Sequence, residues 1–220
     1  MQLDDLGFLV GSNRKEFAMT TAHEALEKLQ RGNERYLSGT RIRSALEHRH
    51  TRGQLSKGQT PFAVVLSCSD SRVPPEIVFD QDLGDLFVIR VAGNIVEPSQ
   101  IASVEYAVGV LGTKLVVVMG HTGCGAVLVT VQAIEDPSIR PSIHMEAIVN
   151  RIETAVRGRD DYDVARNLED KCDITGLANI ANSVERLMLS ELLQAKAQSG
   201  DVLFLGSIYE MDTGVVRWLY

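Results

Sequence analysis

Short apolar runs alternate with segments of helical periodicity through the middle and end of the chain. Phe62–Leu66 and Leu115–Met119 are continuous apolar runs, which is typical of strands buried on both faces. Residues 85–91 and 202–208 have the composition of two more strands, and 215–219 form a candidate edge strand. This alternation predicts an α/β fold with a mostly parallel central sheet of four core strands and helices on both faces.

Helix signals flank these strands. Thr21 to Glu24 matches a capping box and opens a helix that Gly39 is expected to end. Ser99 is the expected N-cap of a helix that runs to Leu111. Further helices are expected over 126–134, 145–156 and 177–198, with a charged loop over 157–173, a solvated basic stretch over 41–58 and an aperiodic arm over 1–19.

Composition bounds the class of protein. A chain of 220 residues with 45% hydrophobic content is expected to form one domain over 1–220. The net charge of −7 gives no electrostatic footprint for nucleic acid or an anionic membrane surface. The acidic start lacks the features of a signal peptide, and no apolar run approaches the ~18 residues of a membrane span. Three cysteines argue against a disulfide framework and favour a reducing cytoplasm.

Three side chains that can bind a metal follow two of the expected strands. Cys68 comes directly after the first strand, and His121 and Cys124 follow the strand Leu115–Gly120. Because the carboxyl ends of parallel strands meet at one edge of a sheet, these side chains are expected to converge there. Two thiols and one imidazole form a ligand set that suits Zn²⁺, and three protein ligands leave one coordination position open for chemistry. Cys172 lies in the charged loop and is expected to have no such role.

An acid–base pair follows the first of these ligands. Asp70 either binds the metal itself or accepts a hydrogen bond from a metal-bound hydroxide, and both alternatives stay open. Arg72 is expected to hold the Asp70 carboxylate through a bidentate pair that favours its ionised form.

Two separated motifs resemble those of the β-class carbonic anhydrases. The first is Cys68-Ser69-Asp70-Ser71-Arg72 with the Val73-Pro74-Pro75-Glu76 that follows, and the second is Gly120-His121-Thr122-Gly123-Cys124-Gly125. Between them, Gly84–Arg90 and Ser103–Ala107 also match the family. The resemblance runs from about Ala22 to Leu219, which is nearly the whole chain.

The resemblance implies a zinc enzyme that reversibly hydrates CO₂ to bicarbonate and a proton by means of zinc-bound hydroxide. It implies a homodimer or a higher even homo-oligomer, with the N-terminal arm and helix over 1–40 packing on a partner subunit. Its zinc ligands fall on Cys68, His121 and Cys124, and its catalytic pair on Asp70 and Arg72. Its substrate-binding residues fall on Gln59, Phe87, Tyr106 and Gly125, of which Gln59 and Tyr106 would face the zinc of the neighbouring subunit.

One position departs from part of the family. Members that are switched by bicarbonate at a non-catalytic pocket carry a tryptophan three residues before the first cysteine, where this chain has Val65. The departure favours the family type with an accessible zinc.

Three other functions stay open. A hydrolase of COS or CS₂ could use the same ligands, and only the shape of its pocket would differ. A non-catalytic zinc scaffold would need Asp70 fixed in the fourth coordination position. A thiol redox protein would be expected to carry Cys-x-x-Cys, where this chain has His-x-x-Cys.

Overall fold

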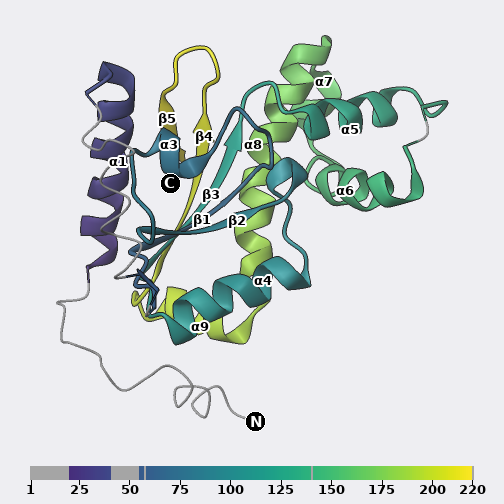
Figure 1. Cartoon of the computed structure of the whole chain (residues 1–220). Helices are drawn as coiled ribbons and strands as arrows, with labels where there is room; N and C mark the ends of the chain where they lie inside the picture. Colours follow the sequence, from purple (N-terminus) through teal and green to yellow (C-terminus); the bar gives the residue numbers. More distant parts are fainter. Residues whose placement is uncertain (1–19, 41–54, 57, 140, 220) are drawn as a thin grey trace.

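The computed structural model describes residues 20–40, 55–56, 58–139 and 141–219 (Figure 1). Within them, one sheet has the strand order β2-β1-β3-β4-β5. The first four strands pair in parallel, and β5 pairs antiparallel with β4. This arrangement confirms the predicted sheet and its edge strand. The strands are β1 (Ala63–Ser67), β2 (Leu86–Arg90), β3 (Leu115–His121), β4 (Leu203–Tyr209) and β5 (Val216–Leu219).

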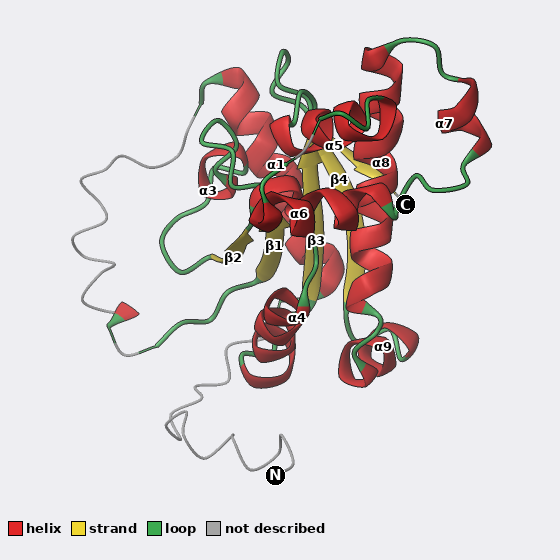
Figure 2. Ribbon diagram, turned by 90° about the vertical axis from the view of Figure 1, so that its right-hand side faces the viewer, coloured by secondary structure: helices red, strands yellow, loops and turns green. Residues whose placement is uncertain are grey.

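Helices cover both faces of the sheet, as predicted. Figure 1 shows α1 on one side of the strands and α4 and α8 on the other. In Figure 2, α5 lies at one end of the sheet and α4 and α9 at the opposite end, and α6 crosses in front of the strands. The helical segments are α1 (Ala22–Ser38), α3 (Pro75–Val78), the 3₁₀ turn η2 (Ala92–Asn94), α4 (Pro98–Glu105), the π-helical turn η3 (Tyr106–Val110), α5 (Gly125–Glu135), α6 (Ile143–Glu153), α7 (Asp160–Val164), α8 (Leu168–Leu187) and α9 (Glu191–Gln198). None of the described helices combines the length and the apolar character needed to cross a membrane.

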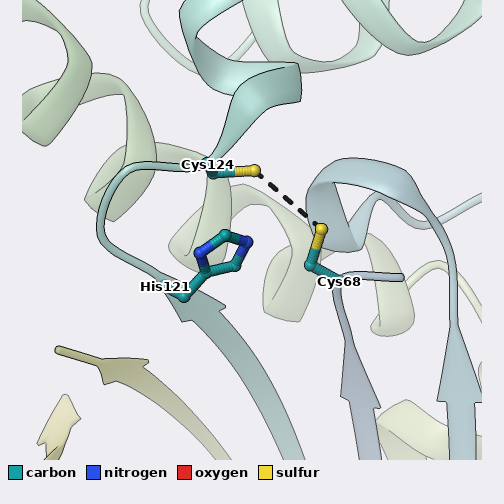
Figure 3. A group of neighbouring side chains, drawn as sticks. All are labelled: Cys68, His121 and Cys124. Carbon is teal, nitrogen blue, oxygen red and sulfur yellow. Dashed lines mark hydrogen bonds between the residues drawn. The ribbon is translucent and has the colours of Figure 1, made fainter. Parts of the chain in front are cut away.

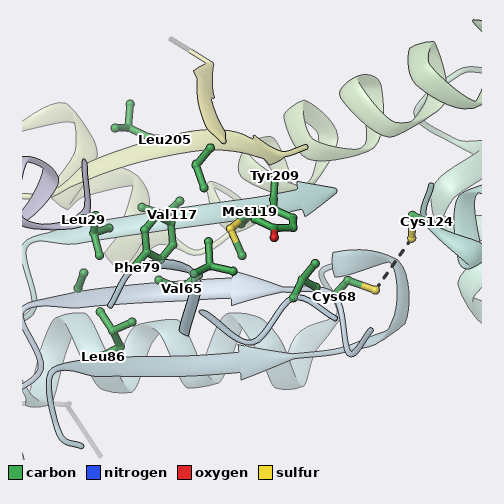
Figure 4. Packing of buried hydrophobic residues seen from close by; sticks show 14 of the residues in the cluster. Leu29, Val65, Cys68, Phe79, Leu86, Val117, Met119, Cys124, Leu205 and Tyr209 are labelled. Carbon is green, nitrogen blue, oxygen red and sulfur yellow. Dashed lines mark hydrogen bonds between the residues drawn. The ribbon is translucent and has the colours of Figure 1, made fainter. Parts of the chain in front are cut away.

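The core has two apolar layers, one on each face of the sheet. Because successive strand residues point to opposite faces, Val65 packs in the layer of Leu29 and Phe79, whereas Val64 packs in the layer of Ile180. Figure 4 shows the first layer continuing along the strands to Cys68. Two of the metal-ligand candidates, Cys68 and Cys124, therefore belong to this packed core.

The N-terminal helix α1 packs against the sheet of its own chain. Its capping box is formed as predicted, with hydrogen bonds between Thr21 and Glu24, and Gly39 ends it with a φ of 70°. The buried Asn33 amide donates to the carbonyl oxygen of Val78 at 3.2 Å, and its oxygen accepts from the Val216 N–H at 3.0 Å. A contact between residues 1–40 and a partner subunit stays a prediction, and residues 1–19 and most of the basic stretch 41–58 lie outside the described residues.

Two predictions about the C-terminal helices were wrong. The expected single helix over 177–198 is two helices, because Ser190 caps the start of α9 by accepting from the Leu193 N–H. The expected loop over 157–173 is partly helical. It contains α7 and the first turns of α8, which begin early because the Asn167 side chain accepts from the Asp170 N–H.

Two further boundaries differ from the prediction. Ser99 is not the N-cap of its helix, because Pro98 takes the first helical position and Glu97 forms a capping box with Gln100. The helix also does not continue regularly to Leu111, since it passes into the π-helical turn η3.

The chain order of the strands places a crevice at the carboxyl ends of the central strands β1 and β3. From β1 the chain passes to β2 on one side, and β3 then returns to the other side of β1. At such a switch point the connections leave in opposite directions, so ligands in open α/β sheets bind there beyond the carboxyl ends of the strands. The carboxyl ends of β1 and β3 lie side by side, with Ser67 in register with Met119.

Candidate metal centre

Cys68, His121 and Cys124 converge at this switch point. Their ligand atoms all lie within 4.8 Å of one another, and all three residues are buried. Figure 3 shows the three side chains pointing toward a common space. The structure therefore brings together the ligand set that the sequence predicts.

Each of the three comes from a different structural context. Cys68 is the first residue after β1, and Cys124 is the N-cap of α5. His121 is the last residue of β3, one residue further into the strand than the sequence indicates. Gly123 makes the turn between His121 and Cys124 with a φ of 64°, a conformation that residues with a Cβ rarely adopt.

The His121 ring is oriented by its backbone. Its Nδ1 lies 2.9 Å from the carbonyl oxygen of Thr122, so Nδ1 carries the proton and donates. In the neutral imidazole, Nε2 then carries the lone pair. Nε2 is buried and has no hydrogen-bond partner among the described residues. A neutral imidazole with one nitrogen bound to a carbonyl and the other unpaired is prepared to bind a metal.

The two sulfur atoms also fit a metal. Cys68 Sγ and Cys124 Sγ are 4.0 Å apart. Two thiolates on one tetrahedral zinc, each about 2.3 Å from it, would be about 3.8 Å apart. The donors and their spacing therefore fit zinc with little rearrangement.

The two thiols titrate as a pair. The hydrogen bond from Cys124 is the main cause that holds the pKa of Cys68 well below its usual range, helped by His121 and by backbone N–H groups. The same hydrogen bond, with burial, raises the pKa of Cys124. The pair therefore shares one proton, which a bound cation would release, because a metal ligates the thiolate form.

Asp70 lies beside this group and is held by Arg72. The Arg72 guanidinium donates from Nε to Asp70 Oδ1 at 2.9 Å and from Nη2 to Oδ2 at 2.7 Å, which confirms the predicted bidentate pair. These bonds keep the pKa of the Asp70 carboxyl well below its usual range, despite partial burial. Asp70 Oδ2 lies 3.9 Å from His121 Nε2. An ionised, acceptor-only carboxylate thus faces the candidate metal space.

The loop that carries Cys68 and Asp70 is fastened by Arg90, at the end of β2. Arg90 Nε donates to the carbonyl oxygen of Cys68 at 3.0 Å, and Nη2 donates to that of Asp70 at 2.5 Å. One planar side chain therefore fixes the backbone of both a candidate ligand and the neighbouring carboxylate.

The predicted substrate-binding residues are only partly gathered in this single chain. Phe87 and Tyr106 have ring centroids 6.1 Å apart, and the Tyr106 residue is 44% exposed. Gln59 is exposed in the segment before β1, and Gly125 is the exposed first residue of α5. The rings of Phe87 and Tyr106 meet, whereas Gln59 makes no hydrogen bond to the described residues of the site.

A pocket of about 120 Å³ opens beside the ligands. His121 and Cys124 line one wall, and Leu128, Cys172 and Asp173 line others. Cys172 lies in α8 and is half-buried, so its predicted placement in an isolated charged loop was wrong. The group formed by His121 and the other two ligands still does not include it.

Comparison with known proteins decides the family. The family model described as carbonic anhydrase matches residues 63–216. The solved structure of the β-carbonic anhydrase CcaA has a TM-score of 0.67 and 29% sequence identity, covering 89% of this chain and 93% of its own. The chain belongs to the β-carbonic anhydrase family. A tetrameric β-carbonic anhydrase of Sordaria macrospora shares the fold, with a TM-score of 0.71, 24% identity and coverage of 90% and 95%.

Curated relatives named as carbonic anhydrases span most of the chain. Carbonic anhydrase 2 of Mycobacterium tuberculosis is 35% identical over 86% of this chain and 89% of its own length. The chloroplastic beta carbonic anhydrase 5 of Arabidopsis thaliana is 26% identical over 84% of this chain and 63% of its own length.

The sequence did not indicate two residues that hydrogen-bond to Cys68 and its loop in this β-carbonic anhydrase site. The Gly93 N–H donates to Cys68 Sγ at 3.3 Å, and Arg90 fastens the ligand loop. Arg90 is the last residue of β2, and Gly93 comes shortly after it. The carboxyl end of β2, a third strand, lies at the same end of the sheet as the ligands. That placement was the available signal for Arg90 and Gly93.

Proposed function

We propose that the protein catalyses the zinc-dependent, reversible hydration of CO₂ to bicarbonate and a proton. One observation carries the proposal: an unpaired buried nitrogen, two sulfurs 4.0 Å apart and an ionised carboxylate all face one space. Membership of the carbonic anhydrase family supports it. Zinc bound there would supply a Lewis acid that makes water a nucleophile at accessible pH.

Cys68, His121 and Cys124 would hold the zinc. The two cysteines would bind as thiolates, and His121 would bind through Nε2, since Nδ1 is committed to the Thr122 carbonyl oxygen. This set leaves a fourth position for water or substrate.

Asp70 would orient the attacking water. Arg72 keeps the Asp70 carboxylate ionised, so the carboxylate can only accept hydrogen bonds. It would accept a hydrogen bond from the water and so orient an oxygen lone pair toward CO₂. Arg72 acts through Asp70 and also donates to the Gly123 carbonyl oxygen at 3.5 Å, which ties the carboxylate to the ligand turn.

Phe87, Tyr106, Gln59 and Gly125 would form the CO₂ site. The Phe87 and Tyr106 rings form an apolar wall suited to a small nonpolar gas, and exposure of Tyr106 and Gln59 in the single chain is consistent with a site completed by a neighbouring subunit. The working assembly would be a homodimer or a higher even homo-oligomer of single-domain chains (1–220), with residues 1–40 packing on the partner. The cytoplasm is the proposed location, with no nucleic acid or membrane partner.

Stopped-flow CO₂ hydration on protein of known zinc content tests the proposal. Activity should require zinc and rise through mildly alkaline pH, because two thiolates offset the charge of Zn²⁺ and weaken its acidity relative to a three-histidine site. A profile that is flat from pH about 6 to about 9 would contradict the assignment. Cys68→Ser should abolish activity, and Cys172→Ser, at the thiol outside the group, should preserve it. Full zinc content without hydration at any pH would favour COS or CS₂ hydrolysis or a scaffold.

A further inference from the structure

The Cys68 sulfur receives a hydrogen bond from a strained backbone segment. The Gly93 N–H donates to Cys68 Sγ at 3.3 Å. Gly93 has a φ of 69°, and the next residue, Asn94, has a φ of 43°. Gly93 adopts this left-handed conformation readily, but a non-glycine residue such as Asn94 is uncommon there and needs support from the surrounding structure.

One face of α8 supplies that support. Three of its side chains, spaced at i, i+4 and i+7, lie on the same side of the helix. Each donates to a different carbonyl oxygen of the segment 93–96. The bonds are Asn179 Nδ2 to Gly93 O at 2.7 Å, Ser183 Oγ to Asn94 O at 3.0 Å and Arg186 Nε to Val96 O at 2.8 Å.

The Asn179 bond has no ready substitute. Asn179 is fully buried and Gly93 is buried, so solvent does not compete for this carbonyl oxygen. On its other side Gly93 is closely packed, since a Cβ there would lie 2.8 Å from Ile152 Cδ1 and 3.1 Å from Ala126 Cβ. The backbone of Gly93 is thus held between α8, its packing neighbours and the sulfur of Cys68.

We propose that Asn179 is a positioning residue of the metal centre. Its amide holds the Gly93 carbonyl group, and with it the backbone of Gly93, so that the N–H of the same residue stays directed at Cys68 Sγ. Ser183 holds the Asn94 carbonyl group in the same way. An N–H donor draws charge from a thiolate ligand and orients it, so partners one step behind the ligands set metal affinity. The inference rests on the proposed role of Cys68 as a ligand.

Asn179→Ala tests this, with Asn182→Ala as the matched control. Asn182 is on the same helix, but its Nδ2 has no hydrogen-bond partner within the described residues. Asn179→Ala should release zinc to a chromophoric chelator about tenfold faster than wild type. In the cobalt-substituted protein, its thiolate-to-cobalt absorption band should move to longer wavelength, because sulfur without the N–H donor gives up charge more readily. Asn182→Ala should match wild type in both measurements.

The outcomes separate this inference from the proposed function. Wild type that binds neither zinc nor cobalt would contradict both. Wild type that binds zinc and hydrates CO₂, with Asn179→Ala equal to Asn182→Ala in release rate and band position, would overturn the inference alone. If Asn179→Ala does not fold, Ser183→Ala and Asn179→Leu decide. Leucine is close to asparagine in shape and has no donor for the Gly93 carbonyl, so an unchanged cobalt band in both variants would also overturn the inference.

Discussion

Arg72 binds both carboxylate oxygens of Asp70 and, through its backbone N–H, binds Oδ1 a second time at 3.0 Å. Three donors from one residue fix the carboxylate in a single orientation beside His121. The pair is mostly exposed on the arginine side, so its contribution to stability is small. Its value lies in orientation and in keeping Asp70 ionised, which is what the proposed chemistry requires.

Asp70→Asn is expected to lower kcat/KM for CO₂ hydration by about 10²-fold or more while zinc content stays at the wild-type level. The amide keeps the shape of the side chain but loses the charge and one of the two acceptor oxygens. Stopped-flow kinetics with metal analysis on the same sample measures both.

The chain offers a control with the same geometry. Arg159 binds Asp161 at 2.9 and 2.7 Å in an exposed bidentate pair on α7. Asp161→Asn should leave hydration unchanged. An equal loss of activity in the two variants, or full activity in Asp70→Asn, would remove Asp70 from the mechanism.

Removal of the metal should destabilise the fold. A ligand that binds only the folded state adds RT ln(1 + [L]/Kd), about 4 kcal/mol at a thousandfold excess over Kd. Wild type treated with a chelator should therefore melt at lower temperature, and added zinc should restore the melting temperature. Cys124→Ser should melt at the same temperature with or without chelator, whereas Cys172→Ser should respond as wild type does.

The sheet and the ligand set could be predicted because their signals are local. Each core strand is a short apolar run, and Cys68 and His121 lie where two such runs end. Parallel pairing then brings these ends together with no further information. The pairing of Asp70 with Arg72 was also predictable, since the two residues are only two positions apart.

The tertiary contacts that hold the site could not be predicted in this way. Asn179 and Gly93 are 86 residues apart in sequence, and a polar residue within a helix usually indicates a solvated face. The division between α8 and α9 depends on Ser190, whose side chain also donates to Glu105 at 2.5 Å. Such tertiary contacts outweigh helix propensity, and a single sequence does not show them.

Strongly alkaline pH should weaken the fold through Tyr209. Burial, with the hydrogen bond to Tyr36 at 3.1 Å, raises the pKa of Tyr209 to about 12 from its ordinary 10.0. The folded state therefore holds the phenol proton more tightly. The resulting stabilisation is complete below pH 10 and is lost as pH rises toward about 12.

Urea denaturation at several pH values between 10 and 12 measures this loss. Tyr209→Phe should reduce the decline in unfolding free energy across this range, and Tyr36→Phe, which removes the hydrogen bond but leaves the burial, should give an intermediate slope. Tyr162, whose pKa is raised by burial and by Glu135, leaves a residual slope in every variant. Identical slopes for Tyr209→Phe and wild type would contradict the assignment. The window lies above the range in which hydration is assayed, so the two pH effects do not overlap.

Two helix glycines should respond to alanine with opposite signs. A Cβ at Gly32 in α1 would lie 1.8 Å from the backbone oxygen of Phe79, so α1 would have to move off the sheet. A Cβ at Gly176 in α8 meets nothing within 4 Å. Alanine favours helix equally at both sites, by about 0.5–1 kcal/mol. Gly176→Ala should therefore stabilise the fold by about that amount, and Gly32→Ala should destabilise it by about 1–3 kcal/mol. Denaturation midpoints at constant m-value measure both, and stabilisation by Gly32→Ala would show that close packing of α1 on the Phe79 turn does not contribute to stability.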